Sequence, residues 1–323
     1  MTFTIDVHLS ADEVRQQMRG DALEGLQGRP KSIPPVWFYD ERGSRLFEDI
    51  TQLPEYYPTR AERALLEAHA PEIAELSKAD TLVELGAGAC DKTRILLTAM
   101  QEAGTLSRYV PFDVSDDFLR DVAATLAEEY DRLDIHVVIG DFHHHLGEIP
   151  SDGRRMIAFL GGTIGNLAAA QRVRFLSQLH ATMSDGDSLL IGTDLVKDRS
   201  RLVAAYDDAA GVTADFNRNV LHVLNEQLGG DFDPDRFRHV ALWNEDEQWI
   251  EMRLRAEEAT EVTLTGADIV VQFDEGEDLL TEISAKFTPQ RVERELRDAG
   301  FVVDGMWGAD DGEFLLTLAH PSV

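Results

Sequence analysis

The chain has 323 residues, which exceeds the usual size of one domain and is enough to bury a substantial core. Lys and Arg together number 30 against 60 Asp and Glu, so the formal net charge at pH 7 is −30. A field of this sign repels nucleic acid and anionic membranes, so we expect neither as a partner. No apolar segment approaches the roughly 20 residues that span a bilayer.

Cysteine usage and the first residues indicate the compartment. Cys90 is the only cysteine, which excludes an intramolecular disulfide and any metal site built from several cysteines. The opening stretch MTFTIDVHLSADE carries acids where a signal peptide has basic residues and an apolar run. These features predict a cytoplasmic protein, which we expect to be a monomer.

The first 60 residues read as an N-terminal arm. A helix-like stretch near Ala11 to Leu26 precedes a segment punctuated by prolines and rich in aromatic residues, from Arg29 to Arg60. Such an arm can pack against the body of the protein. It can also line a ligand pocket, because tyrosine offers a flat apolar face with a hydroxyl tip.

From about residue 61, apolar runs alternate with helical stretches. The helical stretch RAERALLEAHAPEIAELS comes first, and the apolar runs are TLVELGAG, RYVPFDVS, DIHVVIGDF, RMIAFLGGTIG and DSLLIGTDLV. Continuous apolar runs bounded by turn signals are typical of strands that are buried on both faces. The alternation therefore predicts an α/β fold with a doubly wound, mostly parallel sheet covered by helices.

The alternation breaks after Val196. Residues 197–285 hold helical material and then the strand-like pieces FRHVALWN, QWIEMRLRA, EVTLTG and IVVQFDE. The remaining residues predict a helix ending at Gly300 and two strands, which would complete the sheet as an antiparallel pair. We therefore expect one domain from 61–196 plus 286–323, and a second, α+β domain from 1–60 plus 197–285.

Three consecutive histidines, His143, His144 and His145, do not predict a metal site. Consecutive side chains point in different directions on any regular element, and no acidic or cysteine partner stands at a ligand spacing beside them. A polar loop after the third strand explains them, and we expect no metal.

The segment LVELGAGACDKT, residues 82–93, is a glycine-rich turn after a strand. A dinucleotide site requires G-x-G-x-x-G and an acid about 20 residues later. Gly86 and Gly88 fit the first two positions, but Asp91 occupies the third, and the acid that ends the next strand, Asp113, lies 27 residues beyond Gly86. The pattern therefore disfavours a dehydrogenase.

S-adenosylmethionine fits the strand ends better. Backbone at a glycine loop can approach the methionyl part, an acid ending the second strand can accept both ribose hydroxyls, and an acid ending the third can bond the adenine amino group. Capping of the following turns is the alternative explanation for the two later acids. The three strand-end motifs are Glu84-x-Gly86-x-Gly88, Asp113 in VPFDVS, and Asp141 with Phe142 in IGDF.

Longer strings carry a more specific signal than the glycine loop. They are KSIPPVWFYDERGSRLFEDITQLPEYYPTR, VELGAGACDKTR, PFDV, FLGGTIGN, GTDLVKD, YDDAAGVTADFNRNVL and LLTEISAKF. Through these strings the chain resembles, over essentially its full length, the bacterial histidine N-alpha-methyltransferases of ergothioneine biosynthesis. Ala87, Ala89 and Cys90 depart from the more polar loop of that family, which hardly affects cofactor binding because backbone groups do most of the work.

The resemblance implies a class I methyltransferase domain that binds S-adenosylmethionine, and a second domain that closes over L-histidine. Three successive transfers to the alpha-amine would give the trimethylated product, hercynine. It implies cofactor contacts from Gly86, Lys92, Asp113, Asp141 and Phe142. It implies substrate contacts from Tyr56, Gly161, Asn166, Tyr206, Met252, Glu282 and Ser284. Tyr39 stands where the family has a tyrosine near the reacting amine, and we assign it the catalytic role.

The residue types suit these roles. Asn166 and Tyr206 are neutral donors for a carboxylate, while Glu282 and Ser284 alternate on one strand face and offer an acceptor and a hydroxyl to an imidazole. Met252 would supply an apolar wall. Structural explanations exist for each, since a turn asparagine is often structural, a helical tyrosine can be packing, and both strand residues can face water.

Other functions stay open on these residues. The chain can be a methyltransferase that uses another amino acid or amine. It can also be a non-catalytic protein that binds S-adenosylmethionine or histidine.

Overall fold

A computed structural model describes residues 3–88, 92–114, 116–130, 133–142, 144–309 and 312–322. Ala89, Cys90 and Asp91 of the glycine loop, and His143, lie outside the described residues. The chain divides into two compact units. Unit 1 comprises Met1–Leu9, Pro58–Val196 and Lys286–Val323, and unit 2 comprises Ser10–Tyr57 and Lys197–Ala285.

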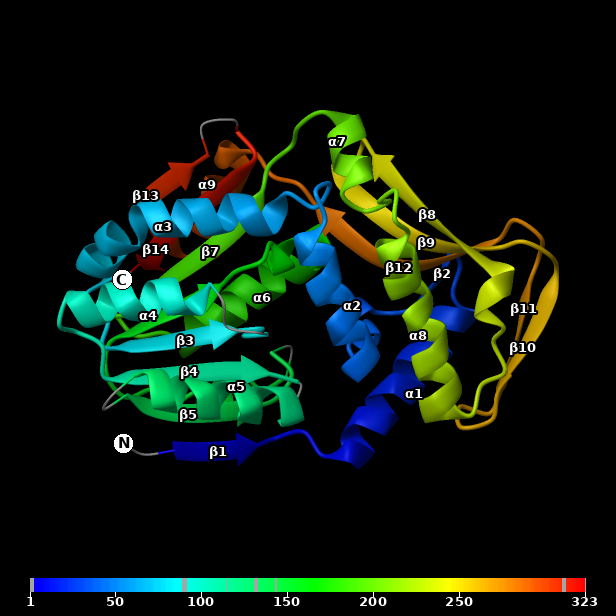
Figure 1. Cartoon of the computed structure of the whole chain (residues 1–323), viewed down its shortest axis with the longest axis horizontal. Coiled ribbons are helices and arrows are strands. Elements are labelled where there is room, and N and C mark those ends of the chain that lie inside the picture. Colours follow the sequence, from blue (N-terminus) through cyan, green and yellow to red (C-terminus); the bar gives the residue numbers. More distant parts are fainter. Residues whose placement is uncertain are drawn as a thin grey trace. The chain divides into compact units, whose positions relative to one another are not determined.

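Among the described residues, unit 1 is built on an eight-stranded sheet in the order β1-β5-β4-β3-β6-β7-β14-β13 (Figure 1). Its first six strands pair in parallel, β14 pairs antiparallel with β7, and β13 pairs antiparallel with β14. The strands are β1 (Phe3–Val7), β3 (Thr81–Leu85), β4 (Arg108–Asp113), β5 (Asp134–Ile139), β6 (Arg155–Phe159), β7 (Ser188–Asp194), β13 (Phe301–Gly308) and β14 (Phe314–Pro321). This confirms the predicted doubly wound, mostly parallel sheet of the class I methyltransferase fold.

Helices flank this sheet (Figure 1). They are α3 (Pro58–Ser77), α4 (Thr93–Glu102), α5 (Asp116–Glu129), α6 (Ala169–Thr182) and α9 (Pro289–Asp298). Every residue of β3, β6 and β7 is buried, which explains why these strands read as unbroken apolar runs rather than as alternating ones. Leu66 and Ile73 of α3 and Leu97 of α4 belong to the core cluster of this unit.

The N-terminal strand differs from the predicted domain boundary. We expected all of residues 1–60 in the second domain, whereas β1 pairs in parallel with β5 and places Ile5 opposite Val137 in unit 1. The residues FTIDV are typical of a strand, but they do not indicate which strand pairs with it, because parallel pairing joins segments that are far apart in the sequence.

Unit 2 contains a four-stranded sheet in the order β2-β12-β9-β8 and a hairpin of β10 and β11. Its strands are β2 (Lys31–Ser32), β8 (Phe237–Asn244), β9 (Trp249–Ala256), β10 (Thr260–Leu264), β11 (Ile269–Phe273) and β12 (Asp278–Ala285). Its helices are α1 (Ala11–Gln27), α2 (Glu41–Gln52), α7 (Arg199–Ala204) and α8 (Val212–Leu228). The strand-like pieces predicted in residues 197–285 are thus confirmed as strands.

A capped turn separates α7 from α8 within the predicted helical segment. Gly211 has a φ of +79°, a conformation that favours glycine, and stands just before the helix. The carboxylate of Asp208 accepts hydrogen bonds from the backbone N–H groups of Val212, at 3.0 Å, and Thr213, at 2.7 Å. These bonds satisfy two of the donors that a helix leaves free at its start, and they lower the pKa of Asp208 against the opposing effect of burial.

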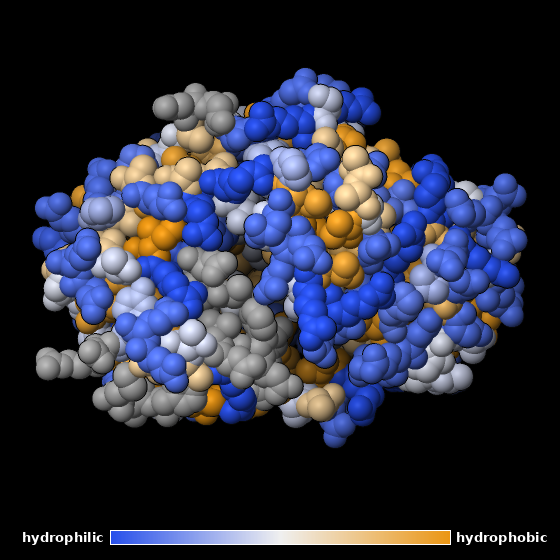
Figure 2. Space-filling model, in the orientation of Figure 1, coloured by the Kyte–Doolittle hydropathy of each residue, from blue (hydrophilic) through white to orange (hydrophobic). Residues whose placement is uncertain are grey.

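The visible surface is mostly hydrophilic (Figure 2). Figure 2 shows hydrophilic side chains over most of the visible face, with hydrophobic ones in scattered groups. Across the part of the chain that the structure describes, no helix combines the length and the apolar character needed to cross a membrane.

A buried ion pair at the start of β6 makes a stability prediction. Arg155 and Asp187 are each 1% exposed, and the guanidinium also donates to the carbonyl of Thr182 at 2.7 Å. Replacing Arg155 with Met leaves a buried carboxylate without its counter-charge, so we expect the free energy of unfolding to fall by about 3–5 kcal/mol. Urea unfolding measures this. The control is the double variant Arg155→Met/Asp187→Asn, which removes the carboxylate charge as well and should lose less of the free energy of unfolding. An equal loss in the single and the double variant would contradict the prediction.

Candidate active site

The glycine loop follows β3 in unit 1. Gly86 and Gly88 have φ values of +72° and +49°, which only glycine adopts without strain. The backbone N–H of Gly86 donates to the carbonyl of Phe112 at 2.8 Å, which ties the loop to β4. A Cβ added at either glycine would meet no atom of the described residues within 4 Å.

Carboxylates end the next two strands of the sheet. Asp113 ends β4, and its Oδ2 accepts from the backbone N–H of Gly88 at 3.3 Å. Asp141 follows β5 and is 4% exposed. Because β3, β4 and β5 are neighbours that run in parallel, the sheet brings the three predicted strand-end motifs to one edge.

Phe142 is fixed by aromatic packing. Its ring lies 5.5 Å from that of Phe159 and 5.7 Å from that of Phe175, in edge-to-face geometry in both cases. The ring is half-buried, so part of it is available as an apolar surface beside Asp141. That placement suits the predicted role beside an adenine ring, and the role itself stays a prediction.

A buried glutamate links Lys92 to Gly161. Glu62, on α3, is 0% exposed and forms an ion pair with the ammonium group of Lys92. Its two carboxylate oxygens accept from the backbone N–H of Gly161 at 2.8 and 2.9 Å. One carboxylate therefore positions a predicted cofactor residue and a predicted substrate residue together.

Glu84 lies near the end of β3, two residues before Gly86. The hydroxyls of Thr93 and Tyr109 both donate to Oε2, the latter at 2.8 Å, and the side chain is buried. Burial raises the pKa of Glu84 to about 7, despite the opposing effect of both hydrogen bonds. The carboxyl group thus joins β3 to the first residue of α4 and to β4.

In unit 2, aromatic rings connect the predicted tyrosines. The Tyr39 ring lies 5.8 Å from that of Phe47, which lies 6.2 Å from that of Tyr56. Tyr56 in turn lies 6.2 Å from Tyr206, again in edge-to-face geometry. Tyr39 is 36% exposed, whereas Tyr56 and Tyr206 are 8% and 7% exposed. The aromatic arm thus packs within unit 2, and it brings three predicted site residues into one group.

Strand β12 adds Glu282 and Ser284 to this group through a register shift. Leu279 stands opposite Leu254 of β9, whereas Glu282 stands opposite Met252, with the irregularity between Leu280 and Glu282. This bulge turns Glu282 and Ser284 to the face of β9 that carries Met252. Glu282 is 9% exposed and Ser284 5%, so neither faces bulk water.

A hydroxyl pair joins β12 to the tyrosines. The Tyr206 hydroxyl lies 2.8 Å from Ser284 Oγ, within hydrogen-bonding distance. Unit 2 therefore brings together Tyr39, Tyr56, Tyr206, Met252, Glu282 and Ser284. The other two predicted substrate residues, Gly161 and Asn166, belong to unit 1, where Asn166 ends a short 3-10 helix (Thr163–Asn166) after the glycine turn.

Sequence reasoning missed Glu62 and the aromatic residues Phe47 and Phe216 that contact Tyr39. A signal for Glu62 was present, because it falls on the buried stripe of α3 with Leu65, Leu66 and Ile73. An acid on an apolar helix face is seldom buried without a partner.

The histidine segment has a structural explanation among its described members. The backbone N–H of Asp141 donates to Nδ1 of His145 at 3.1 Å, and the His145 ring lies 6.2 Å from that of His8. Within the described ranges, no group of three His, Cys, Asp or Glu side chains has a geometry that holds a metal ion.

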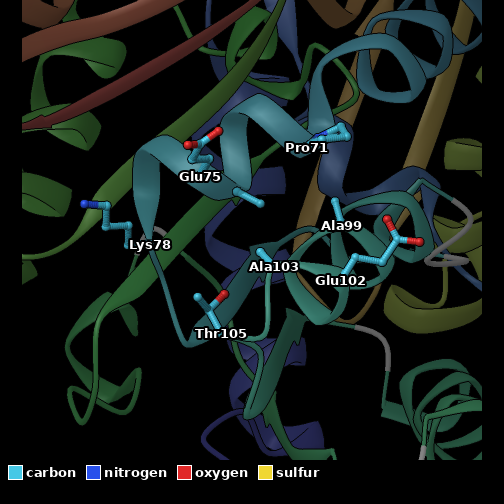
Figure 3. A pocket seen from close by; sticks show the side chains of 8 residues that line it. Pro71, Glu75, Lys78, Ala99, Glu102, Ala103 and Thr105 are labelled. Atoms are coloured by element: carbon cyan, nitrogen blue, oxygen red, sulfur yellow. The ribbon is translucent and has the colours of Figure 1, made fainter.

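A groove of about 440 Å³ lies between α3 and α4, away from these residues (Figure 3). Lys78 and Thr105 line it, and they precede β3 and β4. The groove is therefore at the amino-terminal edge of these strands, opposite the edge that carries the glycine loop. It is lined by Pro71, Ala74, Glu75, Lys78, Ala99, Glu102, Ala103 and Thr105, none of which is a predicted site residue.

The fold and the strand-end motifs define an S-adenosylmethionine-dependent methyltransferase. The sequence profile described as "Histidine-specific methyltransferase, SAM-dependent" matches residues 18–321. The chain belongs to this family.

Three relatives illustrate the similarity. The chain is 53% identical over 319 residues to a histidine N-alpha-methyltransferase of Mycolicibacterium smegmatis, and 52% identical to one of Mycobacterium tuberculosis, with 99% of each chain covered in both cases. It is 30% identical over 230 residues to ergothioneine biosynthesis protein 1 of Neurospora crassa, which covers 70% of this chain and 26% of that one.

The raised pKa of Glu84 predicts how stability depends on pH. The unfolded chain releases this proton near pH 4.5 and the folded chain near 7, so the folded state binds the proton more tightly between these values. Its contribution to stability is therefore lost as the pH rises through this window. In Glu84→Gln, which keeps an acceptor for Thr93 and Tyr109, this loss disappears. We therefore expect the free energy of unfolding of the variant, measured relative to that of wild type, to be higher at pH 8 than at pH 5 by roughly 2–3 kcal/mol, at about 1.4 kcal/mol per pKa unit. Urea unfolding at both pH values measures it, and a constant difference would contradict the prediction.

Proposed function

We propose that this protein transfers methyl groups from S-adenosylmethionine to the alpha-amino group of L-histidine, three times in succession, to give hercynine for ergothioneine biosynthesis. The observation that carries the proposal is the full-length identity of 53% to a relative named histidine N-alpha-methyltransferase. The buried group of Tyr206, Glu282 and Ser284 supports it, because these side chains offer polar atoms of the kinds that a carboxylate and an imidazole require.

The reaction needs positioning more than it needs a nucleophile from the protein. The lone pair of the neutral amine forms the new N–C bond as the C–S bond breaks, and the sulfur keeps the electron pair, so S-adenosylhomocysteine leaves uncharged. Holding donor and amine in line supplies most of the acceleration in a displacement of this kind. The strand-end carboxylates Asp113 and Asp141 and the ammonium of Lys92 would hold the donor.

Each transfer requires an amine without a proton on its lone pair. The ammonium form of histidine loses one proton before the first transfer, and the methylated product loses one before each of the next two. Three protons therefore leave for every three methyl groups transferred. Tyr39 is the residue to which we assign a role in this proton transfer, because it is the exposed member of the tyrosine group.

Product analysis tests the proposal directly. Purified protein is incubated with S-adenosylmethionine and each of the twenty amino acids, and the products are identified by mass spectrometry. We expect mono-, di- and trimethylated histidine in sequence, with activity unchanged by a chelator. Loss of turnover on chelation and its return with added zinc or magnesium would contradict a metal-free reaction.

The same panel separates the alternatives. Methylation of a different amino acid or amine, with histidine left unchanged, would identify a methyltransferase of another specificity. Calorimetric binding of S-adenosylmethionine and histidine without any methylated product would identify a non-catalytic binding protein.

Glu282 makes a specificity prediction. A buried carboxylate favours a substrate that can donate a hydrogen bond to it, so a site with Glu282 should prefer an imidazole over apolar aromatic side chains. Replacing Glu282 with Ala should raise the KM for histidine by about 10- to 100-fold, the effect of one lost hydrogen bond to a charged group. The KM for S-adenosylmethionine should change little.

The measurement is the ratio of kcat/KM for histidine to that for phenylalanine or tryptophan, which should fall in the variant. Glu261→Ala is the matched control, because this glutamate lies on β10 and is exposed. An unchanged ratio in Glu282→Ala would mean that the imidazole is recognised by other residues.

A further inference from the structure

We propose that Asn217, His239 and Thr281 are positioning residues for the imidazole pocket, an inference that rests on the proposed function. These three side chains come from α8, β8 and β12, and are 0%, 6% and 1% exposed. None of them is among the predicted substrate contacts. They form a buried hydrogen-bonded network that ends on the backbone of Tyr206 at one side and on the β12 bulge at the other.

The contacts run continuously through unit 2. Thr281 Oγ1 donates to Asn217 Oδ1 at 2.6 Å and also lies 2.9 Å from the carbonyl oxygen of Met252, so one hydroxyl proton is shared between two acceptors. The Asn217 amide nitrogen lies 3.1 Å from the carbonyl oxygen of Arg253 and 2.8 Å from His239 Nδ1. His239 Nε2 lies 2.8 Å from the carbonyl oxygen of Tyr206.

The direction of each bond is fixed by the two carbonyl groups. A carbonyl oxygen can only accept, so His239 must carry its proton on Nε2 and Asn217 must turn its amide nitrogen toward Arg253. The second amide proton of Asn217 then points to His239 Nδ1, which must be unprotonated to accept it. Burial lowers the pKa of His239, which favours the neutral ring that this arrangement requires.

The two ends of the network are also connected through two of the predicted substrate residues, Tyr206 and Ser284. The Tyr206 hydroxyl lies 2.8 Å from Ser284 Oγ, and Ser284 shares β12 with Thr281. Tyr206 is thus fixed at its carbonyl by His239 and at its hydroxyl by Ser284. Thr281 stands where the register shifts, and its hydroxyl ties the bulge that orients Glu282 and Ser284 both to Asn217 on α8 and to the carbonyl of Met252 on β9. Breaking the network should misplace the imidazole contacts without disturbing the cofactor loop of unit 1.

The test compares two asparagines of α8. Asn217→Leu removes the network, whereas Asn225→Leu removes two bonds to Phe232, at 2.8 and 2.9 Å, that are outside the network. We expect the KM for histidine to rise about tenfold in Asn217→Leu, close to the loss of one net hydrogen bond, while the KM for S-adenosylmethionine stays within about twofold. Asn225→Leu should lower the melting temperature and leave both KM values unchanged.

Rescue at His239 separates positioning from packing. His239→Gln can still donate from its amide to the Tyr206 carbonyl, whereas His239→Leu cannot, so the glutamine variant should retain the lower KM for histidine. In protein labelled with ¹⁵N at histidine, long-range ¹H–¹⁵N spectra should show His239 as the neutral tautomer with its proton on Nε2. Asn217→Leu should change the Nδ1 resonance.

Several results would overturn the proposal. They are a histidine KM that does not move in Asn217→Leu, a parallel rise in both KM values, equal effects of the two His239 variants, or a proton on Nδ1 of His239. If Asn217→Leu loses its cooperative melt, Thr281→Val replaces it in the comparison, because it keeps the side-chain shape and removes the hydroxyl with its bonds to Asn217 and to the carbonyl of Met252. A wild-type protein that methylates no histidine would overturn the proposed function instead, and the tautomer of His239 would still test the network.

Discussion

The parallel pairing of β3, β4, β5 and β6 is the constraint on which the cofactor residues depend. Because these strands run in the same direction, their carboxyl ends meet at one edge and their polar ends share a surface. Glu62 binds two of the loops at that edge, because its carboxylate forms an ion pair with the Lys92 ammonium and accepts a hydrogen bond from the backbone N–H of Gly161. A buried charge is costly unless it is paired, so this contact fixes the loop after β3 relative to the loop after β6.

Much of this edge follows from local sequence. Strands buried on both faces read as unbroken apolar runs, and a run that ends in Gly, Asp or Asn marks a turn at the strand end. The strands of unit 1 other than β1, and the position of Asp113, could therefore be predicted without a structure. The same reasoning located the strands of unit 2, because alternating apolar residues such as Ile250 and Met252 describe a strand with one buried face.

Contacts between distant segments could not be predicted in this way. The bulge in β12 depends on the register against β9, and no local property of LLTEISAKF shows that the face with Glu282 and Ser284, rather than the face with Ile283, is the one that carries Met252. The pairing of β1 with β5 depends on a free sheet edge far away in the sequence. For Glu62 the sequence carries only a weak signal, an acid on an apolar helical stripe. Its function as a link can be assigned only when the structure places Lys92 and Gly161 beside it.

Helix α8 shows how a single element can serve several parts of a site. Asn217 and Asn219 are both fully buried, and residues two positions apart on a helix point to nearly opposite sides. Asn217 bonds toward the sheet of unit 2. The Asn219 amide donates to the carbonyl of Phe38 at 3.0 Å and to Asp40 Oδ1 at 2.7 Å, one on either side of Tyr39. A buried amide without partners would destabilise the helix, so the same hydrogen bonds that stabilise α8 also fix the backbone around the tyrosine and the bulge beside Glu282.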